Sequence, residues 1–299
     1  MGRHARGFGP RAARGGGAST VDLHTHTLRS DGVLTPVELV RDAAAAGITT
    51  LAITDHDTLA GIRDLVLGRA MPASIELITG IEINALARGI PLQDGELHIL
   101  GFGMDLADEA FEATISTQRA ARRIRFERTV NRLREIGLGI DAQVANLTLD
   151  DDDDALGRPT IARALIAAGH ATSVEDAFQR LIGWGGPAYV PREGMGPREA
   201  IEAIRAAGGL PVLAHFSEAP SQMALLRELQ AMGLAGLEVY YRTFPPDTVT
   251  MVGQVARTLG LLATGGSDYH GDLMSYAETH ATLHVPSSVA DDLRAALGS

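Results

Sequence analysis

The sequence predicts an α/β fold in which about seven strands alternate with helices and close into a parallel barrel. Short apolar runs of strand length alternate with longer runs of helical periodicity. Histidine and carboxylate residues recur where the apolar runs end. This alternation favours parallel strands over an antiparallel sandwich, and a doubly wound open sheet is the alternative. The expected strands cover residues 21–24, 48–53, 74–83, 96–102, 210–215, 236–241 and 261–265.

The first helix has the clearest boundaries. Thr35 is the expected N-cap, Pro36 follows at the first helical position, and Glu38 completes a capping box with Thr35. Gly47 suits the position just after the helix end. Further barrel helices are expected up to about residue 69 and over residues 197–207, 221–232 and 248–259.

Residues 105–189 interrupt the alternation and predict a helical insertion. A long helix over 108–136 carries Phe126, Val130 and Leu133 at core spacing, and two shorter helices follow over 161–168 and 173–181. We therefore expect a disordered leader (1–19), a barrel domain (20–104 and 190–299) and a helical cap domain (105–189).

The other faces of the long helix are rich in arginine: Arg119, Arg122, Arg123, Arg125, Arg128, Arg132 and Arg134. This surface is either a solvated helix face or a surface that steers a polyanion by its charge. The solvated face is the preferred interpretation. The acidic run 150–154 is expected to be a solvated loop.

The composition excludes several kinds of chemistry. The 299 residues include no cysteine, which excludes disulfides, thiolate nucleophiles and cysteine-ligated zinc. All 26 basic residues are arginine, which excludes Schiff-base chemistry and a P-loop lysine. The net charge of −11 argues against a broad DNA-binding surface but allows a small phosphorylated substrate. With no apolar run of membrane-spanning length and no secretory pattern, we expect a cytoplasmic protein without membrane partners.

Candidate metal ligands fall at the ends of the predicted strands. His24 and His26 are two residues apart, so in a strand both imidazoles point to the same side. In a (β/α) barrel the C-terminal strand ends carry the active site. The full candidate set is His24, His26, Asp31, His56, Glu82, His98, His215, Asp268 and His270.

This donor set narrows the metal and the reaction. Imidazoles and carboxylates without thiolates suit Mn²⁺, Zn²⁺ or Fe²⁺ better than Ca²⁺. Nine donors exceed the needs of one ion, so two or three divalent ions are expected. Paired ions activate a bridging water and hold both the attacking and the leaving oxygen, which hydrolysis of a phosphate ester uses fully. A metal-bound hydroxide is the expected nucleophile.

Other polar residues have mostly structural interpretations. Asp57 is expected to cap a helix, and Asp55 to orient a ligand imidazole. Trp184 either stacks on a base or packs within its Gly-rich turn. The remaining histidines are expected to be structural or exposed: His4, His170, His280 and His284.

The motifs around the candidate ligands resemble those of the PHP (polymerase and histidinol phosphatase) family over residues 20–104 and 190–285. They are His24-Thr25-His26, Ser30-Asp31-Gly32, Thr54-Asp55-His56-Asp57, Gly80-Ile81-Glu82, His98-Ile99-Leu100-Gly101, Leu213-Ala214-His215 and Gly266-Ser267-Asp268-Tyr269-His270. The resemblance implies a distorted (β/α)7 barrel with up to three metals. These would be held by His24, His26, Glu82 and Asp268; by Glu82, His98 and His215; and by Asp31, His56 and His270. The catalytic hydroxide would be held by Glu82, Asp268 and His215.

The insertion resembles that of the family branch of small-nucleotide phosphatases and 5′→3′ exoribonucleases. The similar segments are Gly157-Arg158-Pro159, Ile161-Ala162-Arg163 and Pro187-Ala188-Tyr189-Val190-Pro191. By this resemblance Arg158 and Arg192 would bind the substrate phosphate, which suits the fork of the guanidinium group. Thr160 stands where the branch usually has histidine, and Phe216 where it usually has proline.

The leading functional prediction is a metal-dependent phosphoesterase that hydrolyses a phosphate monoester of a small nucleotide, such as AMP or a nucleoside 3′,5′-bisphosphate. Three alternatives remain open. They are a 5′→3′ exonuclease on short oligonucleotides such as RNA, a histidinol-phosphate-type phosphatase, and a nucleotide or metal sensor without catalysis.

Overall fold

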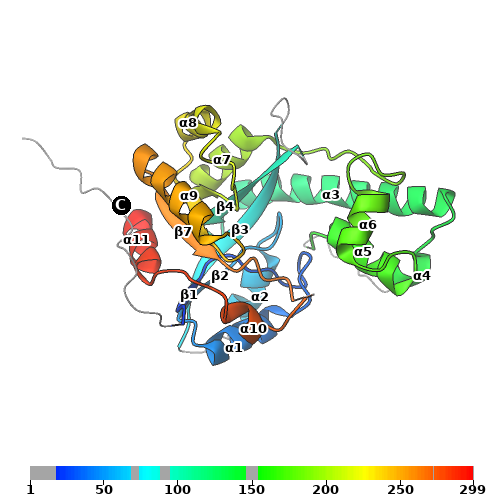
Figure 1. The fold of residues 1–299 in the computed structure, drawn as a ribbon, viewed down its shortest axis with the longest axis horizontal. Coiled ribbons are helices and arrows are strands. Elements are labelled where there is room, and N and C mark those ends of the chain that lie inside the picture. Colours follow the sequence, from blue (N-terminus) through cyan, green and yellow to red (C-terminus); the bar gives the residue numbers. More distant parts are fainter. Residues whose placement is uncertain (1–17, 69–73, 88–94, 146–153, 272, 299) are drawn as a thin grey trace, which may run out of the picture.

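A computed structural model describes residues 18–68, 74–87, 95–145, 154–271 and 273–298 (Figure 1). Its centre is a seven-stranded sheet whose strands neighbour one another in chain order. The strands are β1 (Val21–Asp22), β2 (Thr50–Ile53), β3 (Glu76–Leu86), β4 (Glu96–Phe102), β5 (Leu210–Leu213), β6 (Gly236–Tyr241) and β7 (Leu262–Gly266). The end of β7 returns to the end of β1, where Leu23 N donates to Gly265 O at 3.2 Å and Asp268 N donates to His24 O at 2.8 Å. The sheet is thus a nearly closed barrel, as predicted.

One strand runs against the others, so the expectation of a wholly parallel barrel is wrong for β4. This strand pairs antiparallel with both β3 and β5, and Asn84 lies opposite His98 in the register. Only residues 87–95 separate β3 from β4. A parallel crossover needs a dozen or more residues, so this short connection forces the reversal.

Helices cover the outside of the barrel. They are α1 (Pro36–Ala46), α2 (Ala60–Gly68), α7 (Pro197–Ala206), α8 (Met223–Met232), α9 (Pro246–Leu259), α10 (Tyr276–His280) and α11 (Ser288–Leu297). The predicted capping box of α1 is confirmed, because Thr35 and Glu38 bond each other's backbone N–H groups. Gly47 has a φ of 94° and ends the helix in the left-handed conformation, as expected.

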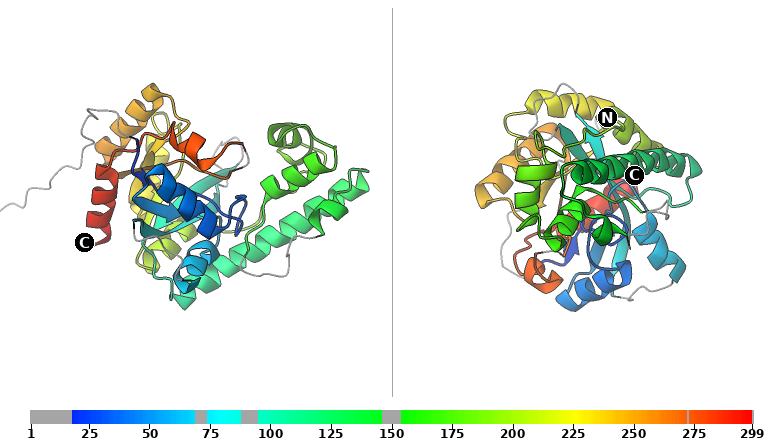
Figure 2. Two further views of the ribbon diagram at one scale, coloured as in Figure 1. Left: turned by 90° about the horizontal axis from the view of Figure 1, so that it is seen from below. Right: turned by 90° about the vertical axis from the view of Figure 1, so that its right-hand side faces the viewer.

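The inserted segment contains α3 (Glu109–Glu135), α4 (Asp141–Val144), α5 (Arg158–Ala167), α6 (Val174–Ala177) and the π-helical turn η1 (Phe178–Ile182). Figures 1 and 2 show α3 running from the side of the barrel to the inserted helices. Phe111 and Ile115 pack into the barrel core, whereas Phe126, Val130 and Leu133 belong to a separate apolar cluster with α5 and η1. We call the second half of α3, together with α4, α5, α6 and η1, the cap. The predicted insertion therefore begins inside the barrel's own packing.

Two expectations from the sequence concern segments that the structure does not describe. Residues 1–17 of the predicted leader and residues 150–153 of the acidic run lie outside the described residues. Within the described ranges, every helix is too short or too polar to span a bilayer.

Candidate active site

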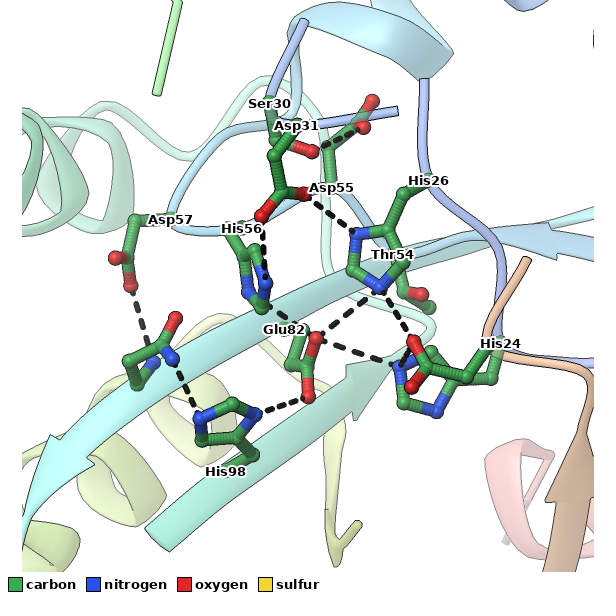
Figure 3. A network of polar contacts seen from close by, with 12 residues as sticks. His24, His26, Ser30, Asp31, Thr54, Asp55, His56, Asp57, Glu82 and His98 are labelled. Atoms are coloured by element: carbon green, nitrogen blue, oxygen red, sulfur yellow. Dashed lines mark hydrogen bonds and ion pairs between the residues drawn. The ribbon is translucent and has the colours of Figure 1, made fainter. Parts of the chain in front are cut away.

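Nine histidine and carboxylate side chains meet at one end of the barrel. Figure 3 labels part of this set: His24, His26, Asp31, His56, Glu82 and His98. They come from the end of β1 and the loop after it, the end of β2, strands β3 and β4, and the ends of β5 and β7. His98 reaches this end from the start of β4 because that strand is reversed. The candidate donor atoms form three overlapping groups: His24, His26, Glu82 and Asp268; Glu82, His98 and His215; and His26, Asp31, His56 and His270.

Glu82 is the centre of the cluster. Its side chain is 1 % exposed, and it contacts five histidines with its two oxygens. Oε2 lies 3.1–3.3 Å from nitrogens of His24, His26 and His56. Oε1 lies 2.8 Å from His98 Nδ1 and 3.3 Å from His215 Nε2. A carboxylate in this position is suited to join two cations.

Several buried polar atoms of the cluster have no hydrogen-bond partner among the described residues. They are His24 Nε2, both ring nitrogens of His26, Asp31 Oδ1, His56 Nδ1 and Glu82 Oε2. A buried polar atom without a partner costs free energy, so such atoms rarely gather in one place. Nitrogen and carboxylate oxygen donors facing a common point fit divalent cations, whose binding satisfies them all.

The electrostatics of the cluster also favour added positive charge. Burial works to raise the pKa of Glu82, but the charges of His56 and His24 outweigh it and hold that pKa well below its usual range. For His24 burial works downward, yet Glu238 and Asp268 raise its pKa well above the ordinary value. Glu82 therefore favours its ionised form and His24 its protonated form, and a bound cation would supply that positive charge instead.

Asp55 fixes the loop that carries Asp31. Its carboxylate accepts hydrogen bonds from Thr27 N at 2.6 Å, Thr27 Oγ1 at 2.7 Å and Ser30 Oγ at 2.7 Å. The expectation that Asp55 orients an imidazole is therefore corrected, since its partners are backbone and hydroxyl groups of the loop.

Three residues outside the predicted set support the donors. Glu238, fully buried in β6, lies 3.0 Å from His24 Nδ1 through Oε1 and accepts from the backbone N–H of His215 at 2.8 Å through Oε2. Asn84 Nδ2 lies 2.6 Å from His98 Nε2, and Tyr241 donates to Asp268 Oδ2 at 2.9 Å. Glu238 was not predicted from the sequence. The signal that could have identified it is a carboxylate inside the otherwise apolar run 236–241.

Backbone strain is concentrated at the same end of the barrel. Asp57, His215 and Asp268 are the non-glycine residues with positive φ in the described chain, at 52°, 33° and 53°. Such conformations cost about 1–3 kcal/mol each and cluster at functional sites. The fold therefore holds these three side chains in place at a local energetic cost.

A pocket of about 430 Å³ opens beside the cluster, between barrel and cap. His56, His98 and His215 contribute to its wall. The wall also contains four arginines, for which we call this cavity the arginine pocket: Arg122, Arg125, Arg158 and Arg192. The wall of this cavity thus contains the two predicted phosphate-binding residues, Arg158 and Arg192, together with four of the candidate metal ligands, because Asp31 lines it as well.

Two buried carboxylates neutralise part of this charge. Asp57 accepts from Arg122 Nε at 2.6 Å and from an Arg192 terminal nitrogen at 2.8 Å. The prediction that Asp57 caps a helix is therefore wrong, because its oxygens accept from these arginines and from the backbone N–H of Asn84.

Glu96 is the second carboxylate, and its contacts are looser. It lies 3.4 Å from Arg125, 3.4 Å from Arg192 and 3.8 Å from Arg158. Burial works to raise its pKa, but Arg192 and Arg158 lower the pKa of Glu96 to about 2. Burial and the charge of Arg158 lower the pKa of Arg125 to about 10, so the guanidinium groups are crowded.

The arginines of α3 divide between two environments. Arg119, Arg122 and Arg125 are 3–8 % exposed and face the barrel and the arginine pocket. The solvated interpretation is wrong for these three, which follow one another at three-residue spacing along one face. It is confirmed for the exposed Arg128, Arg132 and Arg134.

The remaining singled-out residues lie outside the cluster. Trp184 is 74 % exposed and makes an edge-to-face contact with Tyr189. Thr160 is buried, and its hydroxyl has no hydrogen-bond partner in the described chain, while Phe216 lines the arginine pocket. His280 is buried against Ser19 O, whereas His170 and His284 lie near or at the surface, and His4 falls outside the described residues.

Comparison with known proteins identifies the class. A family model described as the PHP domain matches residues 22–131. The chain is 34 % identical over 255 residues to a 5′-3′ exoribonuclease from Haemophilus influenzae, covering 83 % of this chain and 89 % of the relative. The chain therefore belongs to the PHP family, and it is a metal-dependent phosphoesterase, a hydrolase of phosphate ester bonds. The family and fold expected from the motifs are confirmed.

Other relatives share its length and structure. A 3′,5′-nucleoside bisphosphate phosphatase from Chromobacterium violaceum is 29 % identical, with 84 % of this chain and 87 % of the relative covered. A solved metal-dependent phosphoesterase from Bifidobacterium adolescentis superposes with a TM-score of 0.76 at 31 % identity, over 92 % of this chain and 95 % of that one. A Chromobacterium violaceum amidohydrolase, solved with bound sulfate, gives a TM-score of 0.75 at 27 % identity, over 91 % and 100 %.

Proposed function

We propose that this phosphoesterase hydrolyses a phosphate monoester of a small nucleotide, with AMP and nucleoside 3′,5′-bisphosphates as the leading substrates. One observation carries the proposal: nine candidate metal donors line one end of the barrel and open directly onto a pocket with four arginines. The pocket volume of about 430 Å³ suits a ligand of nucleotide size. The name of the Chromobacterium violaceum phosphatase supports the same substrate class.

The three donor groups are proposed to hold two or three divalent cations, with Mn²⁺, Zn²⁺ and Fe²⁺ as candidates. Glu82 belongs to the first and second groups and would contact two cations, and His26 belongs to the first and third groups. Bound there, the cations would activate water and polarise the phosphate as Lewis acids. Glu82, Asp268 and His215 are the residues that would hold the attacking water with these cations.

The protein's own residues are proposed to position the substrate. Arg158 and Arg192 would hold phosphate oxygens with their guanidinium forks, and Nε of Arg192 is buried with no partner in the described chain. Arg122 fixes Asp57, which in turn orients Arg192. Burial between barrel and cap strengthens these interactions, because less water screens them.

The direct test is phosphate release from a panel of nucleotides by the Mn²⁺-loaded protein. We expect turnover of AMP or of a nucleoside 3′,5′-bisphosphate, and a near-complete loss in Asp268→Asn together with reduced bound metal. The matched control is Asp247→Asn, which changes a surface carboxylate in the first turn of α9 and should leave both properties unchanged. Absence of phosphate release from every nucleotide would refute the proposal.

A second candidate is a 5′→3′ exonuclease on short RNA. It is favoured by the names of two relatives, from Haemophilus influenzae (34 % identical) and Salmonella typhimurium (32 % identical). Stepwise shortening of a 3′-labelled oligonucleotide, with no release of inorganic phosphate from AMP, would select this candidate over the first.

A further inference from the structure

One wall residue of the arginine pocket is itself negatively charged, the carboxylate Glu96. Glu96 lines the cavity, its side chain is 6 % exposed, and its oxygens face three guanidinium groups. Its nearest arginine contacts are 3.4–3.8 Å, at or beyond the limit of a good hydrogen bond. Asp57, by contrast, holds two arginines at 2.6 and 2.8 Å and is fully buried. The two carboxylates therefore play different parts: Asp57 is firmly bonded, and Glu96 is weakly held.

The charges around Glu96 are incompletely balanced. Among the described residues, Asp57 and Glu96 are the carboxylates that contact the four arginines of the pocket. The wall of the pocket also contains Asp31, which belongs to the metal cluster, and Glu218, which is exposed. A phosphate monoester carries nearly two negative charges at neutral pH. Such a dianion would meet the same guanidinium groups that Glu96 now contacts, and it would also meet the carboxylate itself.

We infer that Glu96 is a resident competitor for the arginine pocket, a residue that weakens the binding of phosphate anions and so promotes their release. The carboxylate supplies the arginines with a partner while the pocket is empty of substrate. A phosphate entering the pocket displaces these loose contacts and experiences the repulsion of Glu96. This inference rests on the proposed function only for the nature of the natural ligand, since any phosphate ester tests it.

The inference has a quantitative signature. Coulomb energy scales with the product of the charges, so removing one negative charge from the pocket helps a dianion twice as much as a monoanion. In terms of affinity, the factor gained by the dianion is about the square of the factor gained by the monoanion. A change of shape or hydration at the pocket would not follow this rule.

The experiment measures calorimetric binding of methyl phosphate, a dianion, and dimethyl phosphate, a monoanion, to the metal-loaded full chain. In Glu96→Gln we expect methyl phosphate to bind about tenfold tighter and dimethyl phosphate about threefold tighter. Glu96→Asp keeps the charge but withdraws it from the arginines, so its affinities should lie between those of Glu96→Gln and the unchanged protein. Glu193→Gln, which removes an exposed carboxylate paired with Arg128, is the control and should bind both esters unchanged.

Metal content and melting temperature are measured on the same samples, because Glu96 also lies 4.0 Å from His98. With metal content unchanged, weaker or equal binding of methyl phosphate in Glu96→Gln would overturn the inference and assign Glu96 the task of holding the arginines in position. Equal gains for both esters would overturn it as well. If Glu96→Gln does not fold, Glu96→Asp decides the question by comparison with the unchanged protein: tighter binding of methyl phosphate supports the inference, and equal or weaker binding overturns it. Because binding needs no turnover, these outcomes are independent of the nucleotide assay.

Discussion

Glu238, in β6, contacts residues at the ends of two other strands, β1 and β5. It is fully buried and contacts both the His24 ring and the His215 backbone. Replacing it in Glu238→Gln keeps the shape but removes the charge that fixes the His24 imidazole. Partners of this kind typically contribute a factor of 10–100 in metal affinity, and we expect a loss of about that size. A titration against a competing chelator measures it.

The matched control for this change is Glu228→Gln on the exposed face of α8, which should leave metal affinity as it is. Unaltered metal affinity in Glu238→Gln would show that His24 is oriented by its strand alone.

Arg158 allows a test of substrate binding that is separate from the metals. Its guanidinium group lies 5.2 Å from the centre of the Phe178 ring and 3.8 Å from Glu96, and none of the nine cluster residues depends on it. In Arg158→Ala we expect KM to rise about 10–100-fold, the equivalent of one charged hydrogen bond, with kcat little changed. Steady-state kinetics with the best nucleotide give both constants, and Arg128→Ala on the exposed side of α3 is the comparison. A KM equal to that of the unchanged protein would rule out contact with substrate phosphate.

At the scale of single residues, the sequence predicted the candidate metal ligands better than the residues that hold those ligands in position. The nine candidate donor positions were recognisable because most of them stood at strand ends beside apolar runs and all of them fell in motifs that resemble those of the PHP family. The roles of Asn84, Glu96 and Arg122 were not predicted, because they depend on partners 14 to 96 residues away. Arg122 was named only as part of the arginine-rich helix face. Asp57 was misread since a carboxylate just before a helix looks the same in sequence whether it caps the helix or pairs with a distant arginine.

Helix α2 is linked to the cluster through one glycine. A Cβ at Gly61 would lie 2.2 Å from Asp55 Oδ2, the carboxylate that fixes the Asp31 loop. Alanine normally stabilises a helix relative to glycine by up to about 1 kcal/mol. Here we expect Gly61→Ala to destabilise the protein by about 1–3 kcal/mol, because Asp55 must move, and to reduce bound metal. Thermal unfolding and metal analysis test both effects.

Gly253→Ala in α9 is the corresponding helical control, since its Cβ would approach nothing nearer than 3.3 Å. A Gly61→Ala protein with full metal content and increased stability would show that α2 and the Asp31 loop are not coupled.

At the scale of elements, the pattern of apolar runs identified the strands but not their directions. The residues of β4 would suit a parallel strand equally well. The sequence signal for its antiparallel direction is the short connection before it, residues 87–95. The arginine stripe of α3 was ambiguous for a related reason: charge alone does not tell whether a helix face meets solvent or buried carboxylates.

At the scale of the whole molecule, the separate apolar cluster of the cap predicts separate stability. Leu133 is fully buried in this cluster, and truncation of such a residue typically costs 2–5 kcal/mol. In Leu133→Ala we expect amide exchange to accelerate over α4, α5 and η1 while β2, β3 and β6 stay protected. Hydrogen exchange read by mass spectrometry resolves these segments. Equal loss of protection in the strands would mean that barrel and cap unfold as one unit.

The reversal of β4 has a mechanical consequence for the cap. Because that strand runs away from the metal-binding end, the chain leaves it at the opposite end of the barrel, and α3 must travel back along the outside. Its 27 residues span about 40 Å, with barrel packing at one end and the cap's apolar cluster at the other. A continuous helix that is packed at both ends is rigid. The number of residues in α3 therefore fixes the distance between the cap and the cluster, and no hinge in this helix is needed to set it.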